Sequence, residues 1–87
     1  MVVRTLHTGA PESRFGFTAS GALGKAVVRN RVKRRLREAV RSLPVASGWD
    51  IVMNARPKAV QADYHSLHAE LSELLTKARV LEERAGP

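Results

Sequence analysis

The sequence of 87 residues contains no cysteine and no long apolar run. Without cysteine, the chain has no disulfide framework and no cysteine-based zinc site. No apolar stretch approaches the roughly 20 residues that a membrane-spanning helix needs, and the first residues lack the apolar stretch of a signal peptide. We therefore expect one small cytoplasmic domain over residues 1–87, with a frayed tail at 82–87 and no membrane contact.

Acidic residues are almost absent from the segment Lys25–Arg41, which holds eight basic residues and one acid, Glu38. This segment accounts for the formal net charge of +7, because basic and acidic residues balance in the rest of the chain. Charge this concentrated attracts polyanions. Arginine outnumbers lysine there, and its guanidinium suits contacts with phosphates and bases. A surface that served only solubility would mix both signs and favour lysine, so we expect RNA binding.

Three segments have the composition of strands: Met1–Leu6, Arg14–Ser20 and Trp49–Ala55. In the second, Phe15, Phe17 and Ala19 alternate with small or polar residues, which predicts an aromatic face in the core. In the third, the continuous apolar run 51–53 predicts a strand that is covered on both faces.

Two segments have helical periodicity: Ala26–Leu43, and Asp63 to Val80 or Leu81. The first has its apolar residues on an arc of about 120° with basic residues opposite, and Pro44 ends it. The second has Asp63 as a candidate N-cap and an apolar stripe that includes Leu67, Leu71 and Leu74. We interpret it as one amphipathic helix on a sheet; a helical dimerisation module using Leu67–Leu81 is the competing interpretation.

The order of these elements is strand, strand, basic helix, strand, helix. A strand–helix–strand unit implies a parallel pair of strands joined by a crossover, here through the basic helix. The sequence therefore predicts an α+β fold, a two-layer α/β sandwich in β-β-α-β-α order.

Catalytic constellations are missing. His65 and His68 lie three residues apart, which makes a poor metal site without a third ligand. The glycine pair of Gly21–Gly24 lacks the residues that follow in a phosphate-binding P-loop, although the helix that begins after Lys25 could accept one phosphate at its N-terminus. We expect no catalytic residue, no metal site and no directly bound cofactor in this chain.

The basic helix carries the candidate RNA-binding residues on two ridges. Arg29, Lys33 and Arg37 follow one another at four-residue intervals, and Asn30, Arg34 and Arg41 form a second ridge, so both can follow a phosphate backbone. Asn30 can serve RNA binding or hydrogen-bond the crossover turn, and both interpretations stay open. The expected RNA-binding residues are Lys25, Arg29, Asn30, Arg31, Lys33, Arg34, Arg37 and Arg41.

The run Gly24–Glu38, with Arg29-Asn30-Arg31 at its core, closely resembles the signature of the bacterial ribonuclease P protein component. Arg14-Phe15-Gly16-Phe17 and the segment Asp50–Pro57 also resemble that family, in the same order and spacing. The likeness extends from about Val2 to Leu81.

The resemblance implies a function in tRNA maturation. It implies the small protein subunit of a ribonucleoprotein endonuclease that cuts the 5′ leader from precursor tRNA. Its partners would be the catalytic RNA subunit and precursor tRNA, with no further protein required. Hydrolysis and its Mg²⁺ ions would belong to the RNA subunit. Another basic module, ribosome-associated or DNA-binding, is the alternative; a helix-turn-helix reader would need a helix directly before the basic one.

The resemblance also implies structural details. The signature helix would connect its parallel strands by a left-handed crossover, against the usual right-handed rule. The leader would lie in a cleft between the sheet and a terminal helix, for which Phe15 and Phe17 are candidates. We expect the family's N-terminal helix and first strand to be missing before Val2, and Ser20-Gly21-Ala22 replaces a turn that usually carries two lysines. Both departures are expected to affect the leader more than the large RNA.

Overall fold

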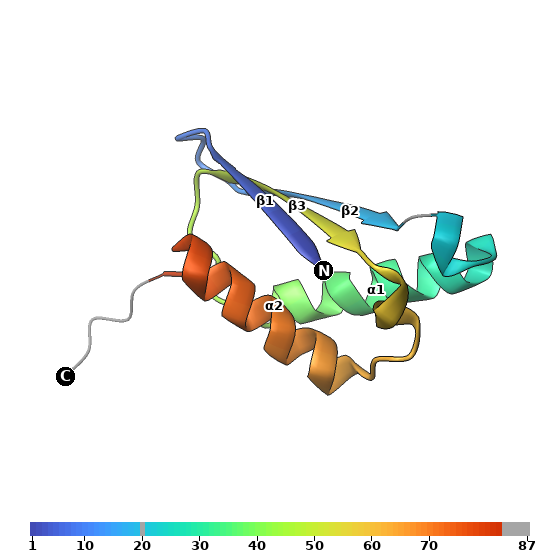
Figure 1. The fold of residues 1–87 in the computed structure, drawn as a ribbon. Coiled ribbons are helices and arrows are strands. Elements are labelled where there is room, and N and C mark those ends of the chain that lie inside the picture. Colours follow the sequence, from blue (N-terminus) through green and yellow to red (C-terminus); the bar gives the residue numbers. More distant parts are fainter. Residues whose placement is uncertain (20, 83–87) are drawn as a thin grey trace.

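The computed structural model describes residues 1–19 and 21–82 as two layers, a three-stranded sheet with two helices on one face (Figure 1). The elements in chain order are β1 (Val2–His7), β2 (Arg14–Ala19), a short 3₁₀ helix (Gly21–Leu23), α1 (Ala26–Arg41), β3 (Trp49–Ala55), a second 3₁₀ helix (Pro57–Val60) and α2 (Tyr64–Ala78). The predicted α+β class, the two layers and the β-β-α-β-α order are confirmed.

The third strand in sequence lies in the middle of the sheet, whose order is β1-β3-β2. It pairs antiparallel with β1, where Val3 lies opposite Met53. It pairs parallel with β2, where Phe17 lies opposite the same Met53. The predicted parallel pair joined through the basic helix is thus confirmed, while the left-handed sense of that crossover stays a prediction.

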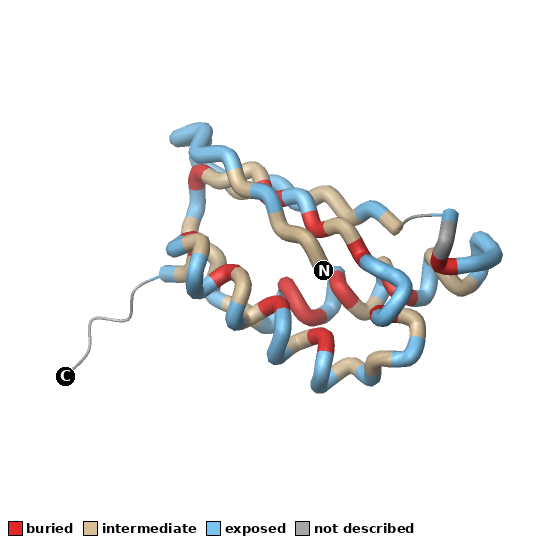
Figure 2. The backbone as a smooth tube through the Cα atoms, in the orientation of Figure 1, coloured by how far each residue is buried: buried red, intermediate tan, exposed pale blue. Residues whose placement is uncertain are grey.

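The core lies between the sheet and the two helices, and Figure 2 marks buried stretches in β3 and in both helices. The buried side chains of these three elements are Ile51, Met53 and Ala55 of β3, Val32, Leu36, Ala39 and Val40 of α1, and Leu67, Leu71 and Leu75 of α2. These α2 leucines are at most 1% exposed, so they have no surface left for a second copy. This burial favours the single amphipathic helix on the sheet over a dimerisation module based on Leu67–Leu81. The predicted Leu74 is only partly buried, and Leu75 takes the central position.

The described residues cover the sheet on one face only, which corrects the prediction for β3. Val52 is 42% exposed between its fully buried neighbours Ile51 and Met53. Its partners in the register are Arg4 and Gly16, neither of which covers it. The apolar run was misleading because valine also suits an exposed strand position through its β-branched side chain.

The helix ends differ slightly from the predictions. α1 ends at Arg41, two residues early. The backbone N–H of Ser42 then donates to the Ala39 carbonyl, and that of Leu43 donates to the Val40 carbonyl. Asp63 is the predicted N-cap of α2, and its side chain accepts a hydrogen bond of 2.8 Å from the Ser66 N–H. α2 stops at Ala78, before the predicted Val80, because Arg79 takes a left-handed conformation with a φ of 59°.

The segment after α2 returns to the loop before β3. The Ala46 N–H donates to the Val80 carbonyl at 2.8 Å, and the Glu82 N–H donates to the Pro44 carbonyl at 2.7 Å. Of the frayed tail predicted for 82–87, only Glu82 belongs to the described residues. Ser20, the predicted end of β2, also lies outside them.

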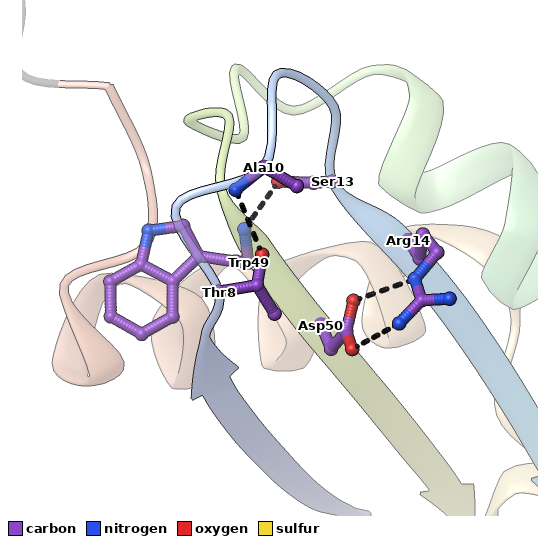
Figure 3. A network of polar contacts seen from close by, with 6 residues as sticks. All are labelled: Thr8, Ala10, Ser13, Arg14, Trp49 and Asp50. Atoms are coloured by element: carbon purple, nitrogen blue, oxygen red, sulfur yellow. Dashed lines mark hydrogen bonds and ion pairs between the residues drawn. The ribbon is translucent and has the colours of Figure 1, made fainter.

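Polar contacts hold the end of the sheet where β3 begins, as Figure 3 shows. Arg14 of β2 donates two hydrogen bonds to Asp50 of β3, at 3.0 and 2.7 Å. The Ser13 hydroxyl accepts a bond from the Trp49 N–H and donates one to the Ala46 carbonyl. These contacts fix the register of the parallel pair.

Leu36 lies in the centre of the core, with no exposed side-chain surface. We expect Leu36→Ala to lower the free energy of unfolding by about 2–5 kcal/mol, because it removes buried methyl groups and leaves a cavity. The matched control is Val27→Ala on the same helix, since Val27 is 67% exposed and should change stability by less than about 0.5 kcal/mol. Circular-dichroism melts measure both. Equal melting of the two variants would contradict the assigned core.

Two carboxyl groups link stability to pH. The hydrogen bonds from Arg14 lower the pKa of Asp50, and the backbone hydrogen bond from Ser66 lowers the pKa of Asp63. Both contributions are complete above the ordinary pKa of about 3.9 and disappear as the pH falls through the lower folded values. Acid titration of the unfolding free energy should show this decline. Asp63→Asn, which keeps a capping oxygen, should make the decline shallower; an unchanged slope would contradict the role of Asp63.

Candidate nucleic-acid interface

The candidate interface is the face of α1 that points away from the core. The chain enters the helix through Gly24, whose φ of 114° suits only glycine. Lys25 is the N-cap and makes no capping hydrogen bond with its side chain. From there the stripe of Val32, Leu36 and Ala39 faces the sheet, so the helical repeat places most of the cations toward solvent.

The structure sorts the expected RNA-binding residues by exposure. Arg29 and Lys33, which border the apolar stripe, are half-buried. The exposed members are Lys25, Asn30, Arg31, Arg34, Arg37 and Arg41. The eight residues therefore lie on the helix α1 and, in the case of Lys25, at its N-cap.

No ion pair within the described part of the chain neutralises the positive charge of this surface. The ion pairs found within residues 1–19 and 21–82 join Arg14 to Asp50, Lys77 to Glu73 and the N-terminal amine to Glu70. None of these pairs uses a cation of α1. The helix thus presents a row of guanidinium and ammonium groups without an ion-pair partner among the described residues, which is the arrangement that binds phosphates.

Two arginines of α1 differ from the other basic residues in the contacts of their side chains. Arg35 donates from Nη1 to the Ala62 carbonyl at 3.2 Å, and so ties α1 to the segment before α2. Arg29 has a buried Nε with no hydrogen-bond partner in the described part of the chain. A buried donor without a partner is costly, so the Arg29 side chain has most to gain from an added acceptor.

Phe15 and Phe17 lie on the helix-bearing side of β2, opposite Ile51 and Met53 of β3. The predicted aromatic core face is confirmed for Phe17, which packs against the core, and is wrong for Phe15, which is 38% exposed. The reason is that β2 is an edge strand, and α1 does not cover its first residues.

A groove begins at these two phenylalanines and runs beside the C-terminal half of α1. Its volume is about 500 Å³, and the Arg37 guanidinium carbon lies 5.4 Å from the centre of the Phe17 ring. Its lining consists of Phe15, Phe17, Arg37, Val40, Arg41, Leu43 and Val45. Sequence reasoning missed this groove, because Val45 comes from the loop after α1 and no local pattern predicts its position.

The open face of the sheet is a separate surface. It carries a hollow of about 280 Å³ lined by Val2, Arg4, Thr18, Val52 and Asn54. Phe15 and Phe17, the residues suggested for a leader cleft, do not line this hollow. The sequence could have indicated this separation, because the alternation of side chains along β2 directs Thr18 to the face opposite Phe15 and Phe17.

Other site types find little support in the described residues. They contain no group of three or more His, Asp or Glu side chains arranged to hold a metal ion. His68 instead contacts the Ser42 hydroxyl through Nε2 at 2.7 Å, which links α2 to the end of α1. Among the helices of residues 1–19 and 21–82, none is long and apolar enough to cross a membrane.

Comparison with known sequences places these features in a family. The family model described as Ribonuclease P matches residues 1–79. The ribonuclease P protein component of Caldanaerobacter subterraneus subsp. tengcongensis is 40% identical over 86 residues, which cover 97% of this chain and 74% of that relative. The Symbiobacterium thermophilum protein of the same name is 49% identical over 78 residues, which cover 87% of this chain and 67% of the relative.

Solved structures agree with the sequence match. The RNase P protein of Staphylococcus aureus superimposes with a TM-score of 0.78 at 30% identity, over 92% of this chain and 75% of that one. The RNase P protein of Thermotoga maritima superimposes with a TM-score of 0.77 at 31% identity, over 86% and 74% of the two chains. The chain therefore belongs to the ribonuclease P family, as a relative of its RNA-binding protein component.

Proposed function

We propose that this chain is the protein subunit of a ribonuclease P, where it binds the catalytic RNA subunit and helps to remove the 5′ leader from precursor tRNA. The observation that carries this proposal is the row of cations on α1 that form no ion pair within residues 1–19 and 21–82, in a chain of this family. In this proposal the RNA subunit and its Mg²⁺ ions perform the hydrolysis, and the protein holds the RNA.

Arg31 and Arg34 are the side chains best placed to hold the large RNA. Both are exposed on the side of α1 that faces away from Val32 and Leu36. A guanidinium donates two parallel hydrogen bonds to one phosphate, which fixes orientation as well as charge. The ridge of Arg29, Lys33 and Arg37 would extend this contact along the helix toward β2.

The open sheet face is the surface that we assign to the leader. It combines the cation Arg4 with the exposed Val52 and the polar side chains of Thr18 and Asn54. A charged group beside apolar and hydrogen-bonding groups suits a single strand, whose phosphates and bases are both accessible. This surface lies on the opposite side of the sheet from α1, so one chain can contact two RNA segments at once.

The function is tested by reconstitution. Adding this chain to the catalytic RNA of its cell should raise the rate of precursor-tRNA cleavage at low Mg²⁺, because its cations supply charge that the RNA otherwise takes from ions. At high Mg²⁺ the RNA alone should cleave at a similar rate, since ions then screen the phosphates. Cleavage at low Mg²⁺ that does not respond to the chain would overturn the proposal.

Removal of single arginines tests the assigned face. We expect Arg31→Ala and Arg34→Ala each to weaken binding to the catalytic RNA by roughly 1–3 kcal/mol. Their melting should resemble that of the parent, because exposed substitutions usually change stability by less than about 0.5 kcal/mol.

The charge-matched control is Lys77→Ala on α2, whose side chain pairs with Glu73 at the surface. Titrations with the catalytic RNA and circular-dichroism melts of all three variants provide the comparison. If Arg31→Ala bound RNA as tightly as Lys77→Ala does, α1 would not be the RNA-binding face. If Arg31→Ala unfolded the protein, its role would be structural.

A further inference from the structure

We infer that the groove between β2 and the C-terminal half of α1 holds one unstacked nucleobase of the bound RNA. This inference rests on the proposed function, because it names what the RNA inserts beside the basic face. The groove is distinct from the open sheet face assigned to the leader, since Phe15 and Phe17 point to the other side of the sheet.

The first wall of the groove is an exposed aromatic ring. Phe15 keeps 38% of its surface exposed, although its partner in the register, Ile51, is completely buried. It stands on β2, whose outer edge is unpaired in the described sheet, so a ligand can reach the ring from the side. Bases stack on such rings with little dependence on sequence, because every base has a π-face.

The second wall is a guanidinium held flat by an aromatic ring. Arg37 lies over Phe17 with 5.4 Å between the guanidinium carbon and the ring centre. This cation–π contact positions the planar group, which can then stack on a base or bind the phosphate beside it. Arg41 follows one helical turn later on the same rim.

The size and charge of the groove fit a base with its phosphate. About 500 Å³ lies within the range of roughly 300–1,000 Å³ typical of small-ligand sites. The floor is apolar, from Val40, Leu43 and Val45, and the lining contains two arginines and no acid. An apolar protein segment would contact the apolar floor but leave both arginines without a partner. A nucleotide can place its base on the floor and its phosphate beside the arginines.

Two RNA probes of equal charge test the inference. One is a short oligoadenylate, and the other is a strand of the same length in which abasic spacers replace every base. If the groove holds a base, Phe15→Ala should weaken oligoadenylate binding by roughly 5- to 150-fold, the equivalent of one stacked base. Binding to the abasic strand should not change, because the phosphate contacts remain.

Three further variants make the result decisive. Phe15→Leu keeps the apolar bulk and the fold but lacks a π-face, so it should weaken oligoadenylate binding alone. Arg37→Lys keeps the charge but loses the planar group, with the same expected selectivity. Leu6→Ala removes an apolar side chain that is 65% exposed on β1 and should change neither affinity. Melting curves confirm that each variant is folded.

The outcomes separate this inference from the proposed function. Equal affinity of the parent for both strands, or equal loss on both strands in Phe15→Ala and Phe15→Leu, would overturn the base-binding groove. Loss of abasic-strand binding in Arg31→Ala would at the same time support the phosphate contacts of α1. If Arg31→Ala changed neither strand while Phe15→Leu still lost the base, the groove would stand and the assigned helix face would be wrong.

Discussion

The structure depends on the burial of the apolar stripe of α1 against the centre of the sheet. Leu36 and Ala39 have no exposed surface. Ala39 packs in one core cluster with Ile51 and Met53 of β3, and Leu36 packs in a second cluster with Ala55 of the same strand. Because this contact fixes the rotation of the helix about its axis, it also fixes which side chains point outward. The hydrophobic core thereby sets the direction of the cations, and a rotation of one residue position, about 100°, would turn Arg37 toward the sheet.

The central position of β3 explains why two separate surfaces exist. It pairs with β1 on one side and with β2 on the other, and both helices cover the same face. The opposite face stays open around Val52, while β2 forms an edge that α1 covers only in part. Because β2 is an edge strand, the first residues of β2 stay partly uncovered.

The sequence alone was sufficient for features that depend on local patterns. The bounds of β3, the N-cap Asp63 and the basic face of α1 follow from hydrophobic periodicity and capping chemistry, which act over a few residues. The exposure of Val52 and Phe15 could not be predicted, because it depends on where distant elements end in space. The groove is a further case, since Val45 is held there by the chain returning after α2 through hydrogen bonds to Pro44 and Ala46.

The basic face of α1 is a compromise between folding and binding. Arg29, Lys33, Arg37 and Arg41 stand one turn apart, and like charges at this spacing destabilise a helix by roughly 0.2–0.5 kcal/mol per pair. No acid of the described residues forms an ion pair with any of them. The helix persists because its apolar stripe is buried, and RNA phosphates would remove the repulsion that remains. Violations of local design rules are expected where function requires them, and here the violation coincides with the residues assigned to RNA.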